Sequence, residues 1–89
     1  MPKVEIYTKS YCPYCHRAKA RLDARNVAYE EIDITFDEAG QREMQLRSNR
    51  RTVPQIFIDG TPIGGSDDLE ALLASGEFDR LMNSDLEVA

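Results

Sequence analysis

The pattern that most limits what this chain can fold into is a pair of cysteines, Cys12 and Cys15, between a predicted strand and a predicted helix. The strand is a short apolar run over 3–8. The helix is expected to begin at Pro13, because proline suits the first helical position. These two are the only cysteines among the 89 residues. A dithiol at a strand-to-helix junction is typical of a reversible redox pair.

Cys12 is predicted to be the nucleophile of this pair, and Cys15 the resolving thiol. Backbone N–H groups in the first turn of a helix lack intrahelical partners, and the helix dipole adds partial positive charge, so a thiolate at Cys12 is stabilised. Lys9 adds a formal positive charge to the same region. Cys15 lies one turn further on and is expected to be more buried. A structural disulfide is the alternative, but closing so short a loop stabilises a fold only slightly.

The rest of the chain predicts alternating strands and helices. The predicted strands cover 3–8, 27–34, 56–58 and 62–64, and the predicted helices cover 13–25, 37–48, 66–75 and 77–82. The turn Asp59-Gly60 indicates a hairpin, and Pro62 places its second strand at a sheet edge. Glu43 and Arg47 have the spacing of an ion pair along a helix. The order β-α-β-α-β-β-α, with a short final helix, predicts an α/β fold with a four-stranded mixed sheet flanked by helices.

Length and charge restrict the class of protein further. The 89 residues suit a single domain over 1–89, with a core at about 3–82 and a frayed tail at 83–89. A net charge of −5 argues against a nucleic-acid partner. The opening residues do not resemble a signal peptide, and no run is long enough to cross a bilayer. We therefore expect a cytoplasmic protein without a membrane partner, and a monomer.

Three motifs, in this order and at this spacing, resemble those of the dithiol glutaredoxins. They are Cys12-Pro13-Tyr14-Cys15, Thr52-Val53-Pro54 and Gly64-Gly65-Ser66-Asp67-Asp68. The resemblance covers about residues 3–82 and is strongest toward the short, glutaredoxin-3-like proteins of bacteria. It implies a thioredoxin-like fold and a glutathione-dependent thiol–disulfide oxidoreductase that reduces protein disulfides and protein–glutathione mixed disulfides. Glutathione would be a co-substrate, the clients would be disulfide-containing or glutathionylated proteins, and no metal or tightly bound cofactor is expected.

The resemblance also implies a set of glutathione-binding residues. They would be Lys9, Tyr14, Thr52, Val53, Pro54, Gly65, Ser66 and Asp67. A cis bond between Val53 and Pro54 would offer the Val53 main chain to the cysteinyl part of glutathione. The helix N-terminus at 65–67 would hold the γ-glutamyl carboxylate, with Asp67 on the neighbouring ammonium. The plainer alternatives are a trans proline and a helix cap formed by Ser66 and Asp67.

The glycine carboxylate of glutathione has several candidate partners. The resemblance assigns Lys9 to it, although an isolated lysine is more often merely solvated. Arg47, Arg50 and Arg51 form a basic patch, and the sequence does not choose which of them assists. The chain also departs from a common pattern of the family, since Ser66 stands where many members carry a further cysteine.

Other functions fit parts of the sequence. A redoxin reduced directly by thioredoxin reductase would use the same cysteines. A glutathione-ligated iron–sulfur cluster is a binding-module alternative, but Pro13 argues against it. The pattern from Cys12 to His16 also matches covalent haem attachment, which requires export. Zinc would lack ligands, because a second pair of cysteines is absent.

Overall fold

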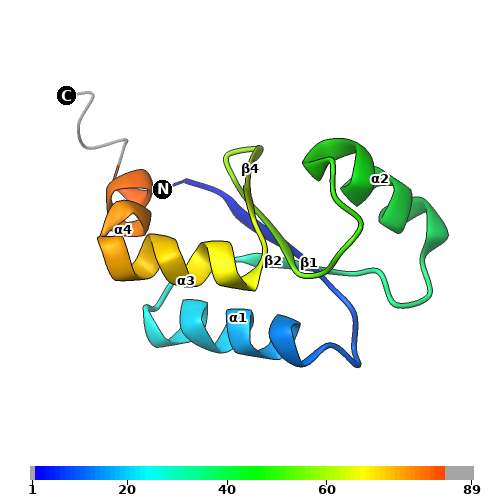
Figure 1. Ribbon diagram of the computed structural model, residues 1–89, viewed down its shortest axis with the longest axis horizontal. Helices are drawn as coiled ribbons and strands as arrows, with labels where there is room; N and C mark the ends of the chain where they lie inside the picture. The colour runs from blue at the N-terminus through cyan, green and yellow to red at the C-terminus, as the bar shows by residue number, and fades with distance from the viewer. Residues whose placement is uncertain (1, 84–89) are drawn as a thin grey trace.

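A four-stranded sheet with helices on both faces organises residues 2–83, the part of the chain that the computed structural model describes (Figure 1). The strands are β1 (Val4–Thr8), β2 (Glu30–Asp33), β3 (Gln55–Ile58) and β4 (Thr61–Gly64), and the helices are α1 (Pro13–Ala24), α2 (Glu38–Ser48), α3 (Ser66–Ser75) and α4 (Glu77–Met82). The predicted order of elements is confirmed. Except for Asn83, the predicted frayed tail lies outside the described residues.

The second strand is shorter than its predicted range of 27–34, and the end of α1 gives the reason. Asn26 adopts a left-handed conformation with φ of 57°, which turns the chain out of the helix. The Val27 N–H still bonds back to the Leu22 carbonyl oxygen at 3.1 Å. Val27 therefore closes the end of α1, and strand pairing starts only at Glu30.

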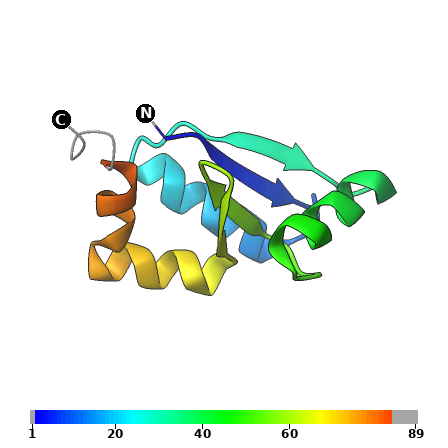
Figure 2. The same ribbon diagram turned by 90° about the horizontal axis from the view of Figure 1, so that it is seen from above.

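The sheet is mixed, as predicted, and its strand order is β2-β1-β3-β4. β1 runs parallel to β2 and antiparallel to β3, while β4 pairs antiparallel with β3 at the edge. Pro62 lies in this edge strand, where the missing N–H costs no interior hydrogen bond. Figure 2 shows α4 at one end of the molecule and α2 at the other.

The core consists of two apolar clusters, one on each face of the sheet. The larger one joins β1 and β3 to the helices α1, α3 and α4 through Val4, Ile6, Ala18, Leu22, Ile56, Ile58, Leu69 and Phe78. The smaller one packs Met44 of α2 against Tyr7 and Phe57. Alternate residues of β1 point to opposite faces of the sheet, as the period of a strand requires. The sheet is thus fixed between two layers, and the end of β1 leads directly to the cysteine pair.

Arg47 ties α2 to β1 across the smaller cluster. Its Nη2 lies 2.9 Å from Glu5 Oε1, and its Nη1 donates to the Tyr7 hydroxyl at 2.8 Å. Its guanidinium carbon is 4.1 Å from the centre of the Phe57 ring. The predicted helix pair of Glu43 with Arg47 is therefore wrong, and Glu43 instead accepts a hydrogen bond from Tyr7.

The ion pair between Glu5 and Arg47 makes the stability of the fold depend on pH. The hydrogen bond from Arg47 holds the pKa of Glu5 below its ordinary value, although burial acts in the opposite direction. The stabilisation is therefore present at neutral pH and is lost as the pH falls below about 4.3. In urea unfolding at about pH 7, the free energy of unfolding should be larger for wild type than for Glu5→Gln. This difference in free energy should become smaller toward about pH 3. The exposed Glu30→Gln is the control, and a gap independent of pH would contradict the expectation.

Gly64, at the junction of β4 and α3, is expected to tolerate no side chain. Its φ is +108°, and an added Cβ would lie within 2.8 Å of the Asp68 Cβ and closer still to its carboxyl group. Gly64→Ala should destabilise the protein by about 2–3 kcal/mol in thermal or urea unfolding. Gly60→Ala is the matched control, because Gly60 has φ of +81° and open space around it. That change should cost only about 1 kcal/mol, and equal losses would argue against the collision.

Candidate active site

Cys12 immediately precedes α1, and its sulfur caps that helix. The Sγ atom accepts a hydrogen bond from the Cys15 N–H at 3.2 Å, and Pro13 holds the first helical position, as predicted. The Cys12 thiol also lies 3.7 Å from the Val53 carbonyl oxygen. Cys12 is 8% exposed, whereas Cys15 has no exposed surface, which agrees with the expected difference in burial. Cys15 is therefore closed to a substrate from solvent, whereas part of Cys12 is exposed.

Cys15 lies in surroundings that favour its neutral thiol. Burial raises the pKa of Cys15, and the neighbouring Cys12 raises it further. The Lys9 main-chain amide and the Lys19 ammonium lower it by smaller amounts. Cys15 is therefore protonated at rest, as a resolving thiol must be if the other sulfur is to attack first.

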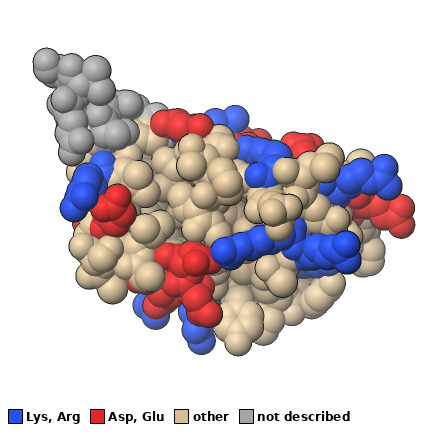
Figure 3. All heavy atoms as spheres, turned by 45° about the horizontal axis from the view of Figure 1, so that its top comes forward, with Lys and Arg blue, Asp and Glu red and all other residues tan. Residues whose placement is uncertain are grey.

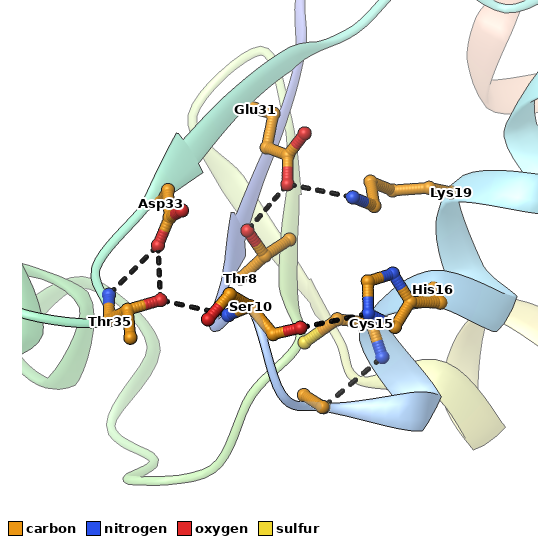
Figure 4. Close-up of polar contacts among 9 residues, drawn as sticks. Thr8, Ser10, Cys15, His16, Lys19, Glu31, Asp33 and Thr35 are labelled. Carbon is orange, nitrogen blue, oxygen red and sulfur yellow. Dashed lines mark hydrogen bonds and ion pairs between the residues drawn. The ribbon is translucent and has the colours of Figure 1, made fainter.

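Lys19 is held beside the cysteines by a short network between α1 and the sheet (Figure 4). Its Nζ lies 2.9 Å from Glu31 Oε2, which also accepts a hydrogen bond from the Thr8 hydroxyl at 2.7 Å. Thr8 is buried and ends β1. The network fixes a positive charge one helical turn after Cys15.

The loop that carries Cys12 is anchored to the end of β2 (Figure 4). The Ser10 N–H donates to the Thr35 hydroxyl oxygen at 2.8 Å, and the Thr35 N–H donates to Asp33 at 2.9 Å. The ring of His16, the residue that the haem-attachment pattern requires, lies 3.0 Å from the Ser10 carbonyl oxygen. The position of the sulfur is thus set by hydrogen bonds on both sides of the loop.

An open pocket of about 210 Å³ is lined by parts of all three motifs. Its lining residues are Tyr14, Arg50, Thr52, Val53, Pro54, Gly65, Ser66, Asp67 and Asp68. Seven of the eight residues predicted to bind glutathione are among them; the eighth, Lys9, is half-buried in the loop before Cys12. Val53 joins this pocket to the nucleophile, because its carbonyl oxygen is the group beside the Cys12 sulfur.

The second and third motifs meet closely at this pocket. The bond between Val53 and Pro54 is cis, as the resemblance implies. Gly65 lies so near that an added Cβ would be 3.2 Å from the Pro54 carbonyl oxygen. Ser66, 7% exposed, lines the same pocket, and its buried hydroxyl oxygen has no hydrogen-bond partner among the described residues. Ser66 thus contributes to the pocket lining, while its hydroxyl oxygen is itself shielded from solvent.

Two lining residues lie outside the predicted binding set: Arg50 was one of three undecided arginines, and Asp68 was named only as part of the third motif. Asp68 Oδ2 accepts the Gly65 N–H and pairs with Arg50 Nη1, both at 2.9 Å. The Gly65 amide and Arg50 together hold the pKa of Asp68 below its usual range. The alternative of a cap by Ser66 and Asp67 is not formed, because Gly65 is the N-cap and Asp68 closes it. Counting from Gly65 as the last residue before the helix would have placed Asp68 at the third helical position, where an acidic side chain closes the cap.

Neither a membrane-spanning helix nor a metal-binding cluster occurs among the described residues. Within residues 2–83, no helix is long and apolar enough to cross a membrane. In the same range, no three His, Cys, Asp or Glu side chains gather into a group that could hold a metal ion.

Comparisons with known proteins agree with this geometry. The family model described as glutaredoxin matches residues 4–63. Glutaredoxin 3 of Escherichia coli (strain K12) is 56% identical over 82 residues, which are 92% of this chain and 99% of that protein.

Solved structures give the same result. The crystal structure of a buckwheat glutaredoxin–glutathione complex has a TM-score of 0.84 at 28% identity, covering 93% of this chain and 78% of that one. The solution structure of glutaredoxin from Brucella melitensis has a TM-score of 0.81 at 48% identity, covering 91% of this chain and 88% of that one. With a family model matched over residues 4–63 and a relative 56% identical over 82 residues, the chain belongs to the glutaredoxin family.

Proposed function

We propose that this glutaredoxin reduces protein disulfides and protein–glutathione mixed disulfides, with glutathione as its co-substrate. Its family consists of thiol oxidoreductases, and a buckwheat relative has been crystallised with glutathione. The observation that carries the proposal is the pocket beside Cys12, whose lining includes seven of the eight predicted glutathione-binding residues and the first turn of α3. The amide groups of that turn lack intrahelical partners and suit a carboxylate.

Glutathione would lie along this pocket with its sulfur toward Cys12. Its γ-glutamyl carboxylate would bind at the N-terminus of α3, with Asp67 facing the adjacent ammonium. Its cysteinyl part would bind the Val53 main chain, next to the Cys12 sulfur. Lys9 and Arg50 are the proposed partners of the glycine carboxylate, because of the three candidate arginines only Arg50 lines the pocket. Arg47 is also held by Glu5 and Tyr7.

The single-thiol route needs only Cys12. Its thiolate attacks the glutathione sulfur of a protein–glutathione mixed disulfide, and the client sulfur leaves with the electron pair and takes up a proton from solvent. A second glutathione, as its thiolate, then attacks the mixed disulfide on Cys12. Oxidised glutathione forms, and the Cys12 thiolate is restored. The net change is an exchange in which one free glutathione thiol is consumed, the client sulfur is released as a thiol, and the disulfide passes to oxidised glutathione.

The two-thiol route requires Cys15 as well. The Cys12 thiolate first forms a mixed disulfide with a client protein, releasing the client's other sulfur. Cys15 then loses its proton to solvent and attacks the Cys12 sulfur, so that the Cys12–Cys15 bond forms and the remaining client sulfur leaves as a thiol. Two glutathione molecules reduce the new disulfide in turn. Lys19 supports this step by favouring the Cys15 thiolate.

The remaining proposals concern the setting of the reaction. We propose a cytoplasmic monomer whose partners are glutathione and disulfide-containing or glutathionylated clients. The pocket favours glutathione as the reductant, because it joins the first turn of α3 to the Val53 main chain, whose carbonyl oxygen lies beside the Cys12 sulfur.

The test is reduction of a small glutathione mixed disulfide, coupled to glutathione reductase and NADPH. A parallel reaction contains thioredoxin reductase in place of glutathione. Turnover with glutathione alone is the expected result. Turnover with thioredoxin reductase alone would retain the cysteine chemistry and reject the glutathione site, and no turnover in either reaction would reject the proposed function.

A further inference from the structure

A second hollow, of about 230 Å³, lies on the C-terminal half of α2 and the loop that follows it. Its lining residues are Arg42, Gln45, Leu46, Asn49, Arg50 and Arg51. Arg50 also lines the glutathione pocket, so the two hollows share a wall. The proposed function uses the first hollow and leaves the second unassigned.

Two of these arginines have no carboxylate partner among the described residues. Arg42 and Arg51 are exposed, and neither forms an ion pair within residues 2–83. By contrast, five other arginines of that range are paired with carboxylates, namely Arg21, Arg25, Arg47, Arg50 and Arg80. Arg17 and Lys9 also form no ion pair within residues 2–83, but they lie outside this hollow, whereas Arg42 and Arg51 both line it. Figure 3 shows basic side chains in a band running from the centre of this face toward one end.

The helix dipole does not account for this cluster. Positive charge is favoured near the C-terminus of a helix, and that effect fades within the last turn. Arg47 lies in the last turn of α2, but Arg42 is the fifth of its 11 residues. Arg42 is therefore too far from the C-terminus of α2 to be explained by an interaction with the helix dipole.

An exposed leucine lies among these arginines. Leu46 is 80% exposed, one helical turn after Arg42 and four residues before Arg50. A single exposed leucine is ordinary on a protein surface. An apolar side chain in a hollow walled by arginines is different, because arginine and apolar groups are enriched where proteins bind one another.

We propose that the arginine–leucine patch, defined as Arg42, Leu46, Arg50 and Arg51, binds an acidic segment of the client protein that also carries an apolar side chain. This proposal rests on the proposed function. Glutathione would occupy the first pocket, so the protein part of a mixed disulfide must extend elsewhere. The shared wall at Arg50 leads from that pocket to the patch. Nucleic acid is the less suitable occupant, because the rest of the chain is acidic.

The test uses two glutathionylated synthetic peptides. One carries aspartates and a leucine beside its modified cysteine, and the other has each aspartate replaced by asparagine. The measurement is kcat/KM for release of the glutathione group at low salt and at about 0.3 M salt. Wild type should prefer the acidic peptide by about tenfold at low salt, and the preference should shrink at high salt.

Charge-reversal variants show which residues cause the preference for the acidic peptide. Arg42→Glu with Arg51→Glu should abolish it, while a small glutathione mixed disulfide is still turned over. The matched control is Arg25→Glu with Arg80→Glu, which makes the same change in net charge near α4, at the other end of the molecule from α2. That control should keep the preference. Leu46→Ser should lower kcat/KM for both peptides, since both carry the leucine.

The outcomes separate this proposal from the one on which it rests. If wild type does not turn over the small mixed disulfide, the proposed function fails. If it does so but treats both peptides alike, only the docking proposal fails. Loss of the preference in the control pair would mean that net charge, and not the patch, attracts the acidic peptide.

Discussion

Replacing Cys12 with serine removes thiol exchange on every substrate, down to the rate of the uncatalysed reaction. A serine hydroxyl cannot take the place of a thiolate in attacking a disulfide sulfur, and Cys15 is fully buried. The loss cannot be attributed to unfolding, because serine is among the preferred residues at a helix N-cap and can accept the same Cys15 N–H. The measurement is the coupled glutathione assay, run with a small mixed disulfide and with a protein disulfide.

A thermal unfolding curve for Cys12→Ser is the control, and its midpoint should stay close to that of the wild type with both cysteines reduced. Activity retained on either substrate would overturn the assignment of roles and make Cys15 the attacking sulfur.

Replacing Cys15 with serine separates the two routes. Removal of glutathione from a client should continue at a rate within about twofold of wild type, because that route needs only Cys12. Reduction of a protein disulfide through the Cys12–Cys15 bond should be lost, since no second sulfur is present to release the client. Mass spectrometry of the reaction should show the client held on Cys12. If both activities disappear together in a folded variant, the single-thiol route is wrong for this protein.

Much of the fold could be predicted because its signals are local. Pro13 marks the start of α1, Asp59-Gly60 marks the hairpin, and Pro62 marks the sheet edge. The residues of the candidate site were found by their spacing within three motifs, and most of them do line one pocket.

The sequence could not predict which residues form ion pairs across the fold. Arg47 has a suitable partner one turn away in Glu43, yet it binds Glu5, which is 42 residues distant. Packing of α2 on the sheet decides that choice, since it places the Arg47 guanidinium over the Phe57 ring and next to β1. The Arg50–Asp68 pair across the pocket follows the same rule, because two separate loops must meet before the pair exists.

The Cys12 sulfur is at once the reacting atom and the N-cap of α1, and this double role links chemistry to thermodynamics. In the reduced protein the sulfur accepts the Cys15 amide hydrogen; once the sulfur enters a disulfide, that acceptor is weakened. The cap therefore contributes folding free energy to the reduced chain and not to the oxidised chain. A thermodynamic cycle requires the same free energy to appear in the reduction potential. The chain should become a stronger oxidant by the amount that its reduced helix gains. A substitution that weakens the start of α1 more in the reduced than in the oxidised chain therefore shifts the redox equilibrium with glutathione.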